Sequence, residues 1–190
     1  MIFSINLSRL SDEQLMERAA SDNKKAFAEL YNRYAQRLQS FLYRQLGGDS
    51  ELAADYTHDT FLRIYDARRQ YRHENSFKTW LFTIASNLCK NRYRHMQVET
   101  KAMALVDQQP EAELPDVEIH LNHEQLAEAL RIVLRELPAE ARMLFALRFE
   151  EELTVAQTAA IMQLPEGTVK SRQHKIINHI KQQLRNYETR

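Results

Sequence analysis

The scarcity of helix-breaking residues is the feature that most limits what this chain can fold into. Its 190 residues include only three glycines and four prolines. Over the long stretches between them, apolar side chains recur three and four positions apart, the spacing that gathers them on one face of an α-helix. Glycine-rich phosphate-binding loops need more closely spaced glycines than this chain has. We therefore predict an all-α protein, and we expect no cofactor.

Helical periodicity and its interruption divide the chain into domains. The first helix is expected to begin near Ser11, whose hydroxyl can cap it, and periodicity continues to about residue 96. From Gln97 the pattern is lost, and Pro110 and Pro115 stand among acidic residues. We predict a helical domain over residues 1–96, an acidic extended linker over residues 97–119 and a smaller helical domain over residues 120–190.

The formal net charge is zero, but the charges are segregated along the chain. Residues 61–98 carry 8 basic and 2 acidic side chains, and residues 153–190 carry 6 and 2. Between these blocks, residues 99–152 carry 5 basic and 13 acidic side chains. Two basic blocks indicate two contacts with a polyanion.

The second basic block contains the run TVAQTAAIMQLPEGTVKSRQHKI, which begins at Thr154. Thr154 followed by Gln157 is a capping-box pattern and predicts the start of a short helix. Pro165 and Glu166 suit the first turn of a second helix, because proline lacks an N–H and the acid faces the positive end of the helix dipole. Two short helices joined by such a turn form a helix-turn-helix.

The second of these helices has two distinct faces. At 100° per residue its apolar side chains gather on one face, and the opposite face is formed by Gly167, Ser171, His174 and Asn178. Its exposed N-terminal half has the dimensions to enter a DNA major groove, with flanking bases on phosphates. The alternative is an ordinary helix hairpin with a basic, solvated face.

The first basic block contains a comparable helix. Leu81, Ile84, Ala85 and Leu88 have the spacing of a core-facing stripe. Asn87, Lys90, Asn91 and Arg94 repeat that spacing on another face, where amides and cations can bind base edges and phosphates. Aromatic residues surround this stripe, which favours unstacked single-stranded bases. They are Tyr71, His73, Phe77, Trp80 and Tyr93, of which we expect Phe77 and Trp80 to pack in the core.

Three segments, in order along the chain, resemble bacterial sigma factors of the extracytoplasmic-function group. AADYTHDTFLRIY resembles the segment that docks on the clamp helices of the largest RNA polymerase subunit. SFKTWLFTIASNLCKNRYR resembles the segment that melts promoters and reads the minus-ten element. LPAEARMLFALRFEEELTVAQTAAIMQLPEGTVKSR resembles the domain that reads the minus-thirty-five element. The acidic linker resembles the family segment that threads the active cleft and RNA exit path.

The resemblance, which covers nearly the whole chain, implies a role for individual residues. It implies polymerase binding by Asp55, Asp59, Thr60 and Phe61. It implies reading of the minus-ten strand by Asn87, Lys90, Asn91 and Arg94, and base capture by the 71–76 loop with Tyr71 and His73. It implies contacts with minus-thirty-five DNA by Thr168, Lys170, Ser171, Arg172, His174 and Lys175.

The resemblance also implies binding partners, and at three positions this sequence departs from the family's usual residue. The implied partners are core RNA polymerase, promoter DNA and an anti-sigma factor. His58 stands where the family usually has glutamine, and Ile177 stands where a basic residue is common. Gln163 replaces the usual turn glycine, at a modest backbone cost if its conformation is left-handed.

Two other classes of protein compete with a sigma factor. A conventional helix-turn-helix regulator would bind duplex DNA without polymerase, but the aromatic, basic first domain and the acidic linker argue against it. An enzyme is the third reading. The pair His123–Glu124 hints at a metal, but the H-E-x-x-H motif fails because residue 127 is alanine, so we expect no metal site and no catalysis.

The sequence also favours one cellular location. Cys89 is the only cysteine, which excludes an internal disulfide and fits a reducing compartment. The first ten residues lack the features of a signal peptide, and no apolar run approaches the roughly 20 residues that a membrane span needs. We therefore expect a cytoplasmic protein without membrane insertion.

Overall fold

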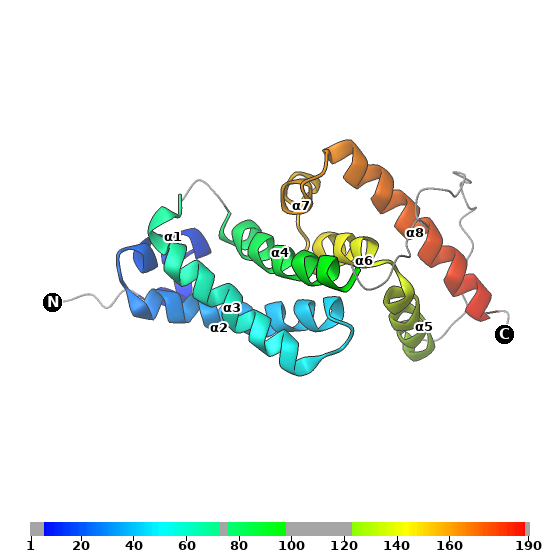
Figure 1. Ribbon diagram of the computed structural model, residues 1–190, viewed down its shortest axis with the longest axis horizontal. Helices are drawn as coiled ribbons and strands as arrows, with labels where there is room; N and C mark the ends of the chain where they lie inside the picture. The colour runs from blue at the N-terminus through cyan, green and yellow to red at the C-terminus, as the bar shows by residue number, and fades with distance from the viewer. Residues whose placement is uncertain (1–5, 73–75, 98–122, 189–190) are drawn as a thin grey trace. The chain divides into compact units, whose positions relative to one another are not determined.

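A computed structural model describes residues 6–72, 76–97 and 123–188 of the chain (Figure 1). Every element within these ranges is helical, so the predicted all-α class is confirmed. The chain divides into two compact units, Met1–His95 and Met96–Arg190, which we call the first and second domains. Gln97, expected to open the linker, is the last residue of a helix, and the remainder of the predicted linker lies outside the described residues.

The first domain consists of four α-helices and two short 3₁₀ turns. Ser11 begins the first α-helix with a complete capping box, as its sequence predicts, and the side chains of Asn23 and Asp49 cap the next two. The third of these helices ends at Ala67, and the chain continues as a 3₁₀ turn to Gln70. The elements are η1 (Leu7–Arg9), α1 (Asp12–Ala20), α2 (Lys24–Gln45), α3 (Ser50–Ala67), η2 (Arg68–Gln70) and α4 (Phe77–Gln97).

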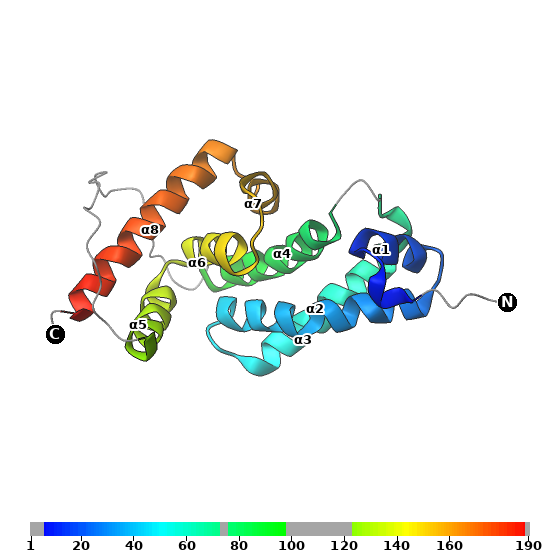
Figure 2. The ribbon, with the colours of Figure 1, turned by 180° about the vertical axis from the view of Figure 1, so that it is seen from behind.

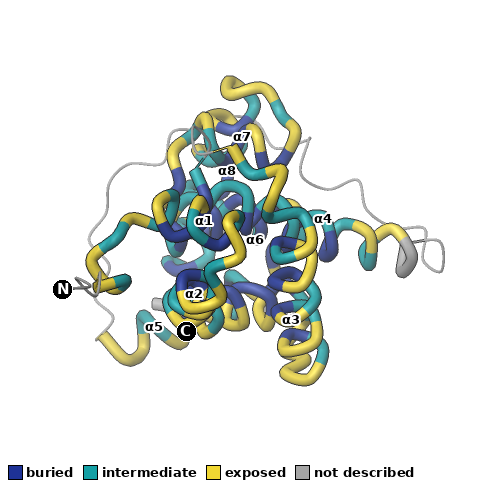
Figure 3. The backbone as a smooth tube through the Cα atoms, turned by 90° about the vertical axis from the view of Figure 1, so that its left-hand side faces the viewer, coloured by how far each residue is buried: buried dark blue, intermediate teal, exposed yellow. Residues whose placement is uncertain are grey.

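Aromatic side chains join the helices of the first domain. Helices α2 and α3 run side by side (Figure 2). Tyr34 and Phe41 of α2 contact Phe77 and Phe82 of α4 edge-on, with ring centroids 5.4 and 5.1 Å apart. Such rings bury large apolar areas and prefer this geometry. Buried residues alternate with exposed ones along the helices (Figure 3), so each helix keeps one face for solvent.

Arg33 of α2 fastens the N-terminal turn to the domain. Its guanidinium donates to the carboxylate of Asp12 at 2.8 Å and to the backbone carbonyls of Leu7, Ser8 and Leu10. The fork of five N–H donors suits this multiple pairing, which lysine could not reproduce.

The second domain contains the predicted helix-turn-helix. Thr154 caps its first helix with a capping box, as its sequence predicts, and Pro165 immediately precedes the second. The run after Pro138 begins as an α-helix, and its second half forms a wider π-helical turn. The elements are α5 (His123–Glu136), α6 (Ala139–Phe145), η3 (Ala146–Glu150, π-helical), α7 (Val155–Met162) and α8 (Glu166–Glu188).

Arg148, in the π-helical turn, links three segments of the second domain. Its Nε donates to Oε1 of Gln173 on α8 at 2.8 Å, and its Nη1 donates to the carbonyl oxygen of Leu153 just before α7. Because one planar guanidinium serves both partners, it fixes the two helices of the helix-turn-helix relative to the preceding turn.

The turn between α7 and α8 has a left-handed residue. Gln163 has φ 61° and ψ 44°, the conformation that most helices assign to glycine at this position. The backbone cost foreseen for Gln163 is therefore present. A left-handed conformation costs a residue with a Cβ about 1–2 kcal/mol.

We predict that Gln163→Gly raises the free energy of unfolding of the second domain by about 0.5–1 kcal/mol, after allowance for the greater backbone entropy of glycine. Native-state hydrogen exchange of the buried α7 and α8 amides measures this domain separately from the first. Gln182→Gly, at an exposed position inside α8, is the control and should instead destabilise by about 1 kcal/mol. Faster exchange of these amides in Gln163→Gly than in the wild type would contradict the strain assigned to this turn.

Candidate nucleic-acid and protein interfaces

One edge of α3 carries acidic side chains. Asp55 and Asp66 are exposed and Asp59 is partly exposed. Arg63 pairs with Asp59 one turn away, at 3.0 Å between Nη2 and Oδ2, and both side chains remain accessible. An exposed pair of this kind contributes little stability, so its carboxylate stays available to another cation.

Leu62 lies on the same edge and was missed by the sequence analysis. Its side chain is 49% exposed. Leu62 follows Asp55 by seven positions and Asp59 by three, the spacing of one helix face. A helical wheel drawn from the acidic residues rather than the apolar ones would have found it. We call Asp55, Asp59, Leu62 and Asp66 the α3 edge.

Thr60 and Phe61 face the other way. The hydroxyl of Thr60 donates to the carbonyl of Tyr56 at 2.7 Å, and the residue is buried. Phe61 is also buried and packs against Phe27 and Tyr31, with centroids 6.2 and 4.7 Å apart. Tyr31 itself remains 41% exposed although its spacing predicts burial. The side chains of Thr60 and Phe61 therefore support α3 from within the domain.

We predict that Phe61→Ala lowers the free energy of unfolding of the first domain by about 3–5 kcal/mol, because it leaves a cavity among aromatic rings. Leu62→Ala, the matched control next to it, should change this free energy by less than about 0.5 kcal/mol. Urea unfolding followed by tryptophan fluorescence measures this, since Trp80 of the first domain is the only tryptophan in the chain. Equal losses in the two variants would mean that the burial assigned to α3 is wrong.

The polar stripe of α4 lies on a helix with a buried opposite face. Leu81, Ala85 and Leu88 are buried, as their spacing predicts, whereas Ile84 of the same stripe is only partly buried. The stripe itself consists of two exposed side chains, Asn91 and Arg94, and two partly buried ones, Asn87 and Lys90. Helix α4 thus holds two amides and two cations along one accessible side.

Tyr93, one of the aromatic residues around this stripe, connects α4 to α2. Its hydroxyl donates to the carbonyl oxygen of Gln45, the last residue of α2. This bond ties the second half of α4 to the body of the first domain, and so supports the stripe on which Asn91 and Arg94 lie.

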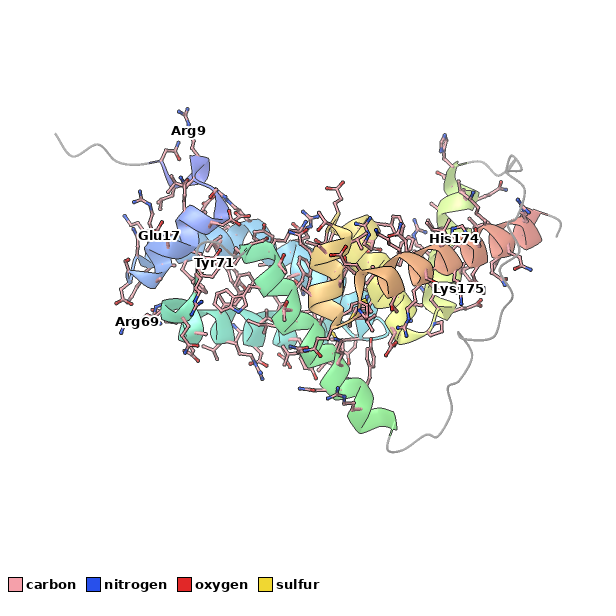
Figure 4. All side chains as sticks on the ribbon, turned by 90° about the horizontal axis from the view of Figure 1, so that it is seen from above. Arg9, Glu17, Arg69, Tyr71, His174 and Lys175 are labelled. Atoms are coloured by element: carbon pink, nitrogen blue, oxygen red, sulfur yellow. The ribbon has the colours of Figure 1, made fainter. Side chains whose placement is uncertain are left out.

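Tyr71 and Trp80 form a stacked pair. Their ring centroids are 5.4 Å apart with 29° between the planes, and both residues are partly exposed. Phe77 is fully buried, which confirms the expected core position, whereas Trp80 is only partly so. Burial, with a smaller effect of Glu13 and Asp12, raises the pKa of Tyr71 to about 12, so its hydroxyl stays neutral near pH 7. Tyr71 is labelled in Figure 4, and His73 lies outside the described residues.

Helix α8 presents the face that the sequence predicts. Val169, Ile176, Ile180 and Leu184 are buried. Gly167, Lys170, Ser171 and His174 are exposed, while Thr168, Arg172 and Lys175 are partly exposed. Figure 4 labels His174 and Lys175 on this helix. The buried residues anchor α8, which leaves its polar side free for a ligand.

Two side chains of α8 have partners within the domain. Arg172 donates to Oε2 of Glu140 on α6 at 2.9 Å, a contact that the sequence analysis missed. Nδ2 of Asn178 lies 3.0 Å from Nε2 of His174. The pair of Arg172 and Glu140 is distant in the sequence, so no spacing pattern could have predicted it. The pair of His174 and Asn178 has the i, i+4 spacing of neighbours on a helix.

The surroundings of Gly167 show no reason why the fold needs a glycine at this position. A methyl group at this position would meet no other atom within 4 Å, and its φ is not in the left-handed range. The residue lies in the first turn of α8, where alanine is the better helix former. Nothing within the described domain therefore requires a glycine at this position.

The described residues offer neither a cluster of metal ligands nor a membrane-spanning helix. Within residues 6–72, 76–97 and 123–188, no three His, Cys, Asp or Glu side chains are grouped as metal ligands. His123 and Glu124 are exposed. None of the helices described has the length and apolar character needed to cross a bilayer.

Comparison with known proteins gives a consistent result. A family model described as Sigma-70 region 2 matches residues 30–97, and one described as Sigma-70, region 4 matches residues 133–182. The chain is 33% identical over 175 residues to the ECF RNA polymerase sigma-E factor of Haemophilus influenzae, covering 86% of this chain and 90% of that one. It is 30% identical over 173 residues to the sigma-E factor of Escherichia coli, covering 86% and 89%.

Solved structures agree on the fold. CnrH in complex with the cytosolic domain of CnrY matches with a TM-score of 0.68 at 22% identity, covering 92% of this chain and 97% of that one. The sigma factor RpoE of Bartonella quintana, in complex with the anti-sigma factor NepR, matches with a TM-score of 0.62 at 23% identity, covering 85% and 98%. With its two matched regions and its full-length relatives, the chain belongs to the extracytoplasmic-function family of RNA polymerase sigma factors.

Proposed function

We propose that this sigma factor binds core RNA polymerase through the α3 edge, reads the minus-ten strand with α4 and reads minus-thirty-five duplex DNA with α8. The observation that carries this proposal is shared by α4 and α8, since each has an accessible polar face opposite a buried apolar one. The protein acts in the cytoplasm and has no catalytic activity of its own. An anti-sigma factor, like the one bound to the Bartonella quintana protein, holds it in check.

Transcription from a promoter library tests the function as a whole. The full chain with core polymerase should produce run-off transcripts from a subset of promoters, and neither component alone should do so. A conventional helix-turn-helix regulator would instead bind upstream duplex DNA equally well without polymerase and would not confer promoter choice on the core enzyme.

The α3 edge offers polymerase both charge and an apolar contact. Asp55, Asp59 and Asp66 favour a basic partner surface, and Leu62 supplies apolar area at the centre of the edge. Thr60 and Phe61, which are buried, contribute by holding α3 in place. We therefore explain their match to the family's polymerase-binding positions by the support they give to α3, rather than by direct contact with polymerase.

We predict that Asp55→Lys combined with Asp59→Lys weakens core binding at least tenfold, because like charges then face each other across the interface. The control is Glu17→Lys combined with Glu124→Lys, two exposed acids that give the same change in net charge away from α3. Fluorescence titration with core enzyme measures affinity, and circular dichroism checks the fold. Wild-type affinity in a folded α3 variant would refute the docking assignment.

The stripe of α4 suits the minus-ten strand. Amides pair with base edges, while Lys90 and Arg94 bind phosphate. Single strands also need a stacking surface, and the pair of Tyr71 and Trp80 precedes the stripe on the same domain. We assign His73 to the same base-capturing loop on the basis of the resemblance.

We predict that Asn87→Ala and Asn91→Ala each reduce promoter opening and relax base preference in the minus-ten element. Arg94→Ala should instead weaken binding across sequences and lower the salt slope by about one. Permanganate footprinting of holoenzyme complexes and salt titrations measure these effects. Asn32→Ala, an exposed amide on α2, is the control. If both amide variants open every promoter as well as the wild type does, the stripe is only a solvated surface.

Helix α8 suits the minus-thirty-five major groove. Ser171, His174 and Lys175 are placed to reach bases, and Thr168, Lys170 and Arg172 to reach phosphates. Arg172 is bound to Glu140, but its side chain is partly exposed and that of Glu140 is exposed, so a phosphate can compete for the guanidinium. Gly167 leaves the start of the helix free to approach the DNA backbone closely.

We predict that Gly167→Ala leaves the second domain as stable as the wild type or up to about 1 kcal/mol more stable. The same variant should bind the upstream element several-fold more weakly, because a methyl group then stands between helix and backbone. Hydrogen exchange measures stability, and holoenzyme footprinting on promoters mutated only upstream measures binding. Gln182→Ala is the control. Unchanged binding by Gly167→Ala would exclude a close approach at this end of α8.

A further inference from the structure

The two ends of α1 contact the two segments that carry the stacked pair of Tyr71 and Trp80. Tyr71 directly follows η2, and Trp80 lies in the first turn of α4. The two rings therefore belong to different segments, and no shared helix sets the position of one against the other. Contacts from a third element have to do so, and α1 supplies them.

At the C-terminal end of α1, Asp22 binds two neighbouring guanidinium groups. Its carboxylate oxygens accept from Arg68 at 2.6 Å and from Arg69 at 2.7 Å. Arg68 also donates to the carbonyl oxygen of Tyr65 at 2.7 Å, and its guanidinium lies 4.0 Å from the centre of the Tyr65 ring. The backbone carbonyl of Arg68 accepts from the N–H of Tyr71 at 3.3 Å. Asp22 thus fixes η2 and, through it, Tyr71.

The conformation and the charge of Asp22 can be separated by substitution. Its backbone is left-handed, with φ 64°, a conformation that aspartate and asparagine tolerate better than other residues with a side chain. The hydrogen bonds from Arg68 and Arg69 lower the pKa of Asp22, so its carboxylate is ionised near pH 7. Asparagine at this position would keep the turn but offer only one oxygen and no charge.

At the N-terminal end of α1, Glu13 caps α4. Its Oε1 accepts from the backbone N–H of Phe77 at 3.3 Å, while the hydroxyl of Ser76 accepts from that of Thr79. The first turn of α4 contains no acidic residue of its own, so the carboxylate at the positive end of this helix dipole comes from α1. After burial, Glu13 is the next cause of the raised pKa of Tyr71, which indicates that its carboxylate lies near that ring.

We propose that Asp22 and Glu13 are positioning residues for the stacking of a minus-ten base on Tyr71 and Trp80. This inference rests on the proposed reading of the minus-ten strand by the first domain. It assigns a purpose to α1, which carries none of the residues expected to contact DNA. Stacking depends on the position and tilt of each ring. By holding η2 at one end and the start of α4 at the other, α1 keeps the two rings together.

The first test uses the full chain without DNA. Trp80 is the only tryptophan, so its emission and its near-ultraviolet circular dichroism report on the stacked pair. Tyr71→Ala defines the signals of Trp80 without its partner. Asp22→Asn and Glu13→Ala should each shift both signals towards those of Tyr71→Ala. Glu13→Gln, which keeps an acceptor oxygen for the N–H of Phe77, should retain the wild-type signals. Wild-type signals in both Asp22→Asn and Glu13→Ala would overturn the proposal.

The second test measures how tightly holoenzyme binds a fluorescein-labelled single strand. The strand copies the non-template minus-ten region of a promoter that the wild-type holoenzyme transcribes. Tyr71→Ala should weaken binding by about fivefold or more, the lower end of what one stacked base contributes. Asp22→Asn and Glu13→Ala should each weaken it by about two- to fivefold, and neither should add to the loss when combined with Tyr71→Ala.

Glu17→Ala, which removes an exposed acid from the middle of α1, is the matched control (Figure 4). It should bind the strand at least as tightly as the wild type, and so should Glu13→Gln, which removes the same charge as Glu13→Ala. Losses that add to that of Tyr71→Ala, or equal losses in Glu13→Gln and Glu13→Ala, would overturn the proposal, because the acids would then act through stability or charge.

The outcome for Tyr71 separates this inference from the function on which it rests. Weaker binding by Tyr71→Ala, together with wild-type binding by Asp22→Asn and Glu13→Ala, would overturn the positioning role alone. Wild-type binding by Tyr71→Ala would instead overturn the proposed stacking at this pair, and the inference with it. Thermal melts followed by far-ultraviolet circular dichroism check that each variant is folded at the temperature of the titration.

Discussion

The burial of one apolar face on each of α4 and α8 is the constraint on which the rest of the structure depends. A short helix has too little intrinsic stability to hold a set of side chains in register by itself. Leu81 and Leu88 hold α4 against the first domain, and Val169 and Ile176 hold α8 in the second. These contacts place the polar residues of both helices, so the proposed recognition and the folding use opposite sides of the same helix.

The elements that obey local rules could be predicted from the sequence. The capping boxes at Ser11 and Thr154 form as their side-chain patterns require, because each is closed by residues three positions apart. The buried stripe of α8 follows from its spacing alone. The exposure of Tyr31 and Leu62 does not follow from spacing, because it depends on where neighbouring helices end and how they cross. Periodicity identifies the apolar residues but not the edge of the contact that covers them.

The contacts that tune the candidate interfaces were less predictable. Glu140 and Arg172 are 32 residues apart, and Arg148 reaches Gln173 over 25 residues. No pattern within one helix reports such pairs. They matter because a guanidinium already bound to a carboxylate exchanges one partner for another when it meets phosphate. In the proposed complex, the net attraction between Arg172 and DNA would be smaller than that of an unbound cation, which favours specific contacts over general affinity.

The π-helical turn of Ala146–Glu150 also determines how the second domain can change in evolution. A π-turn holds one more residue than the α-helical turn that would replace it, so removing one residue there would restore regular winding. Such a deletion would change the direction in which Arg148 points, and its guanidinium would no longer reach Gln173 and Leu153 together. Insertions and deletions should therefore be tolerated in exposed connections of this domain but excluded from this turn, whose length is as restricted as its composition.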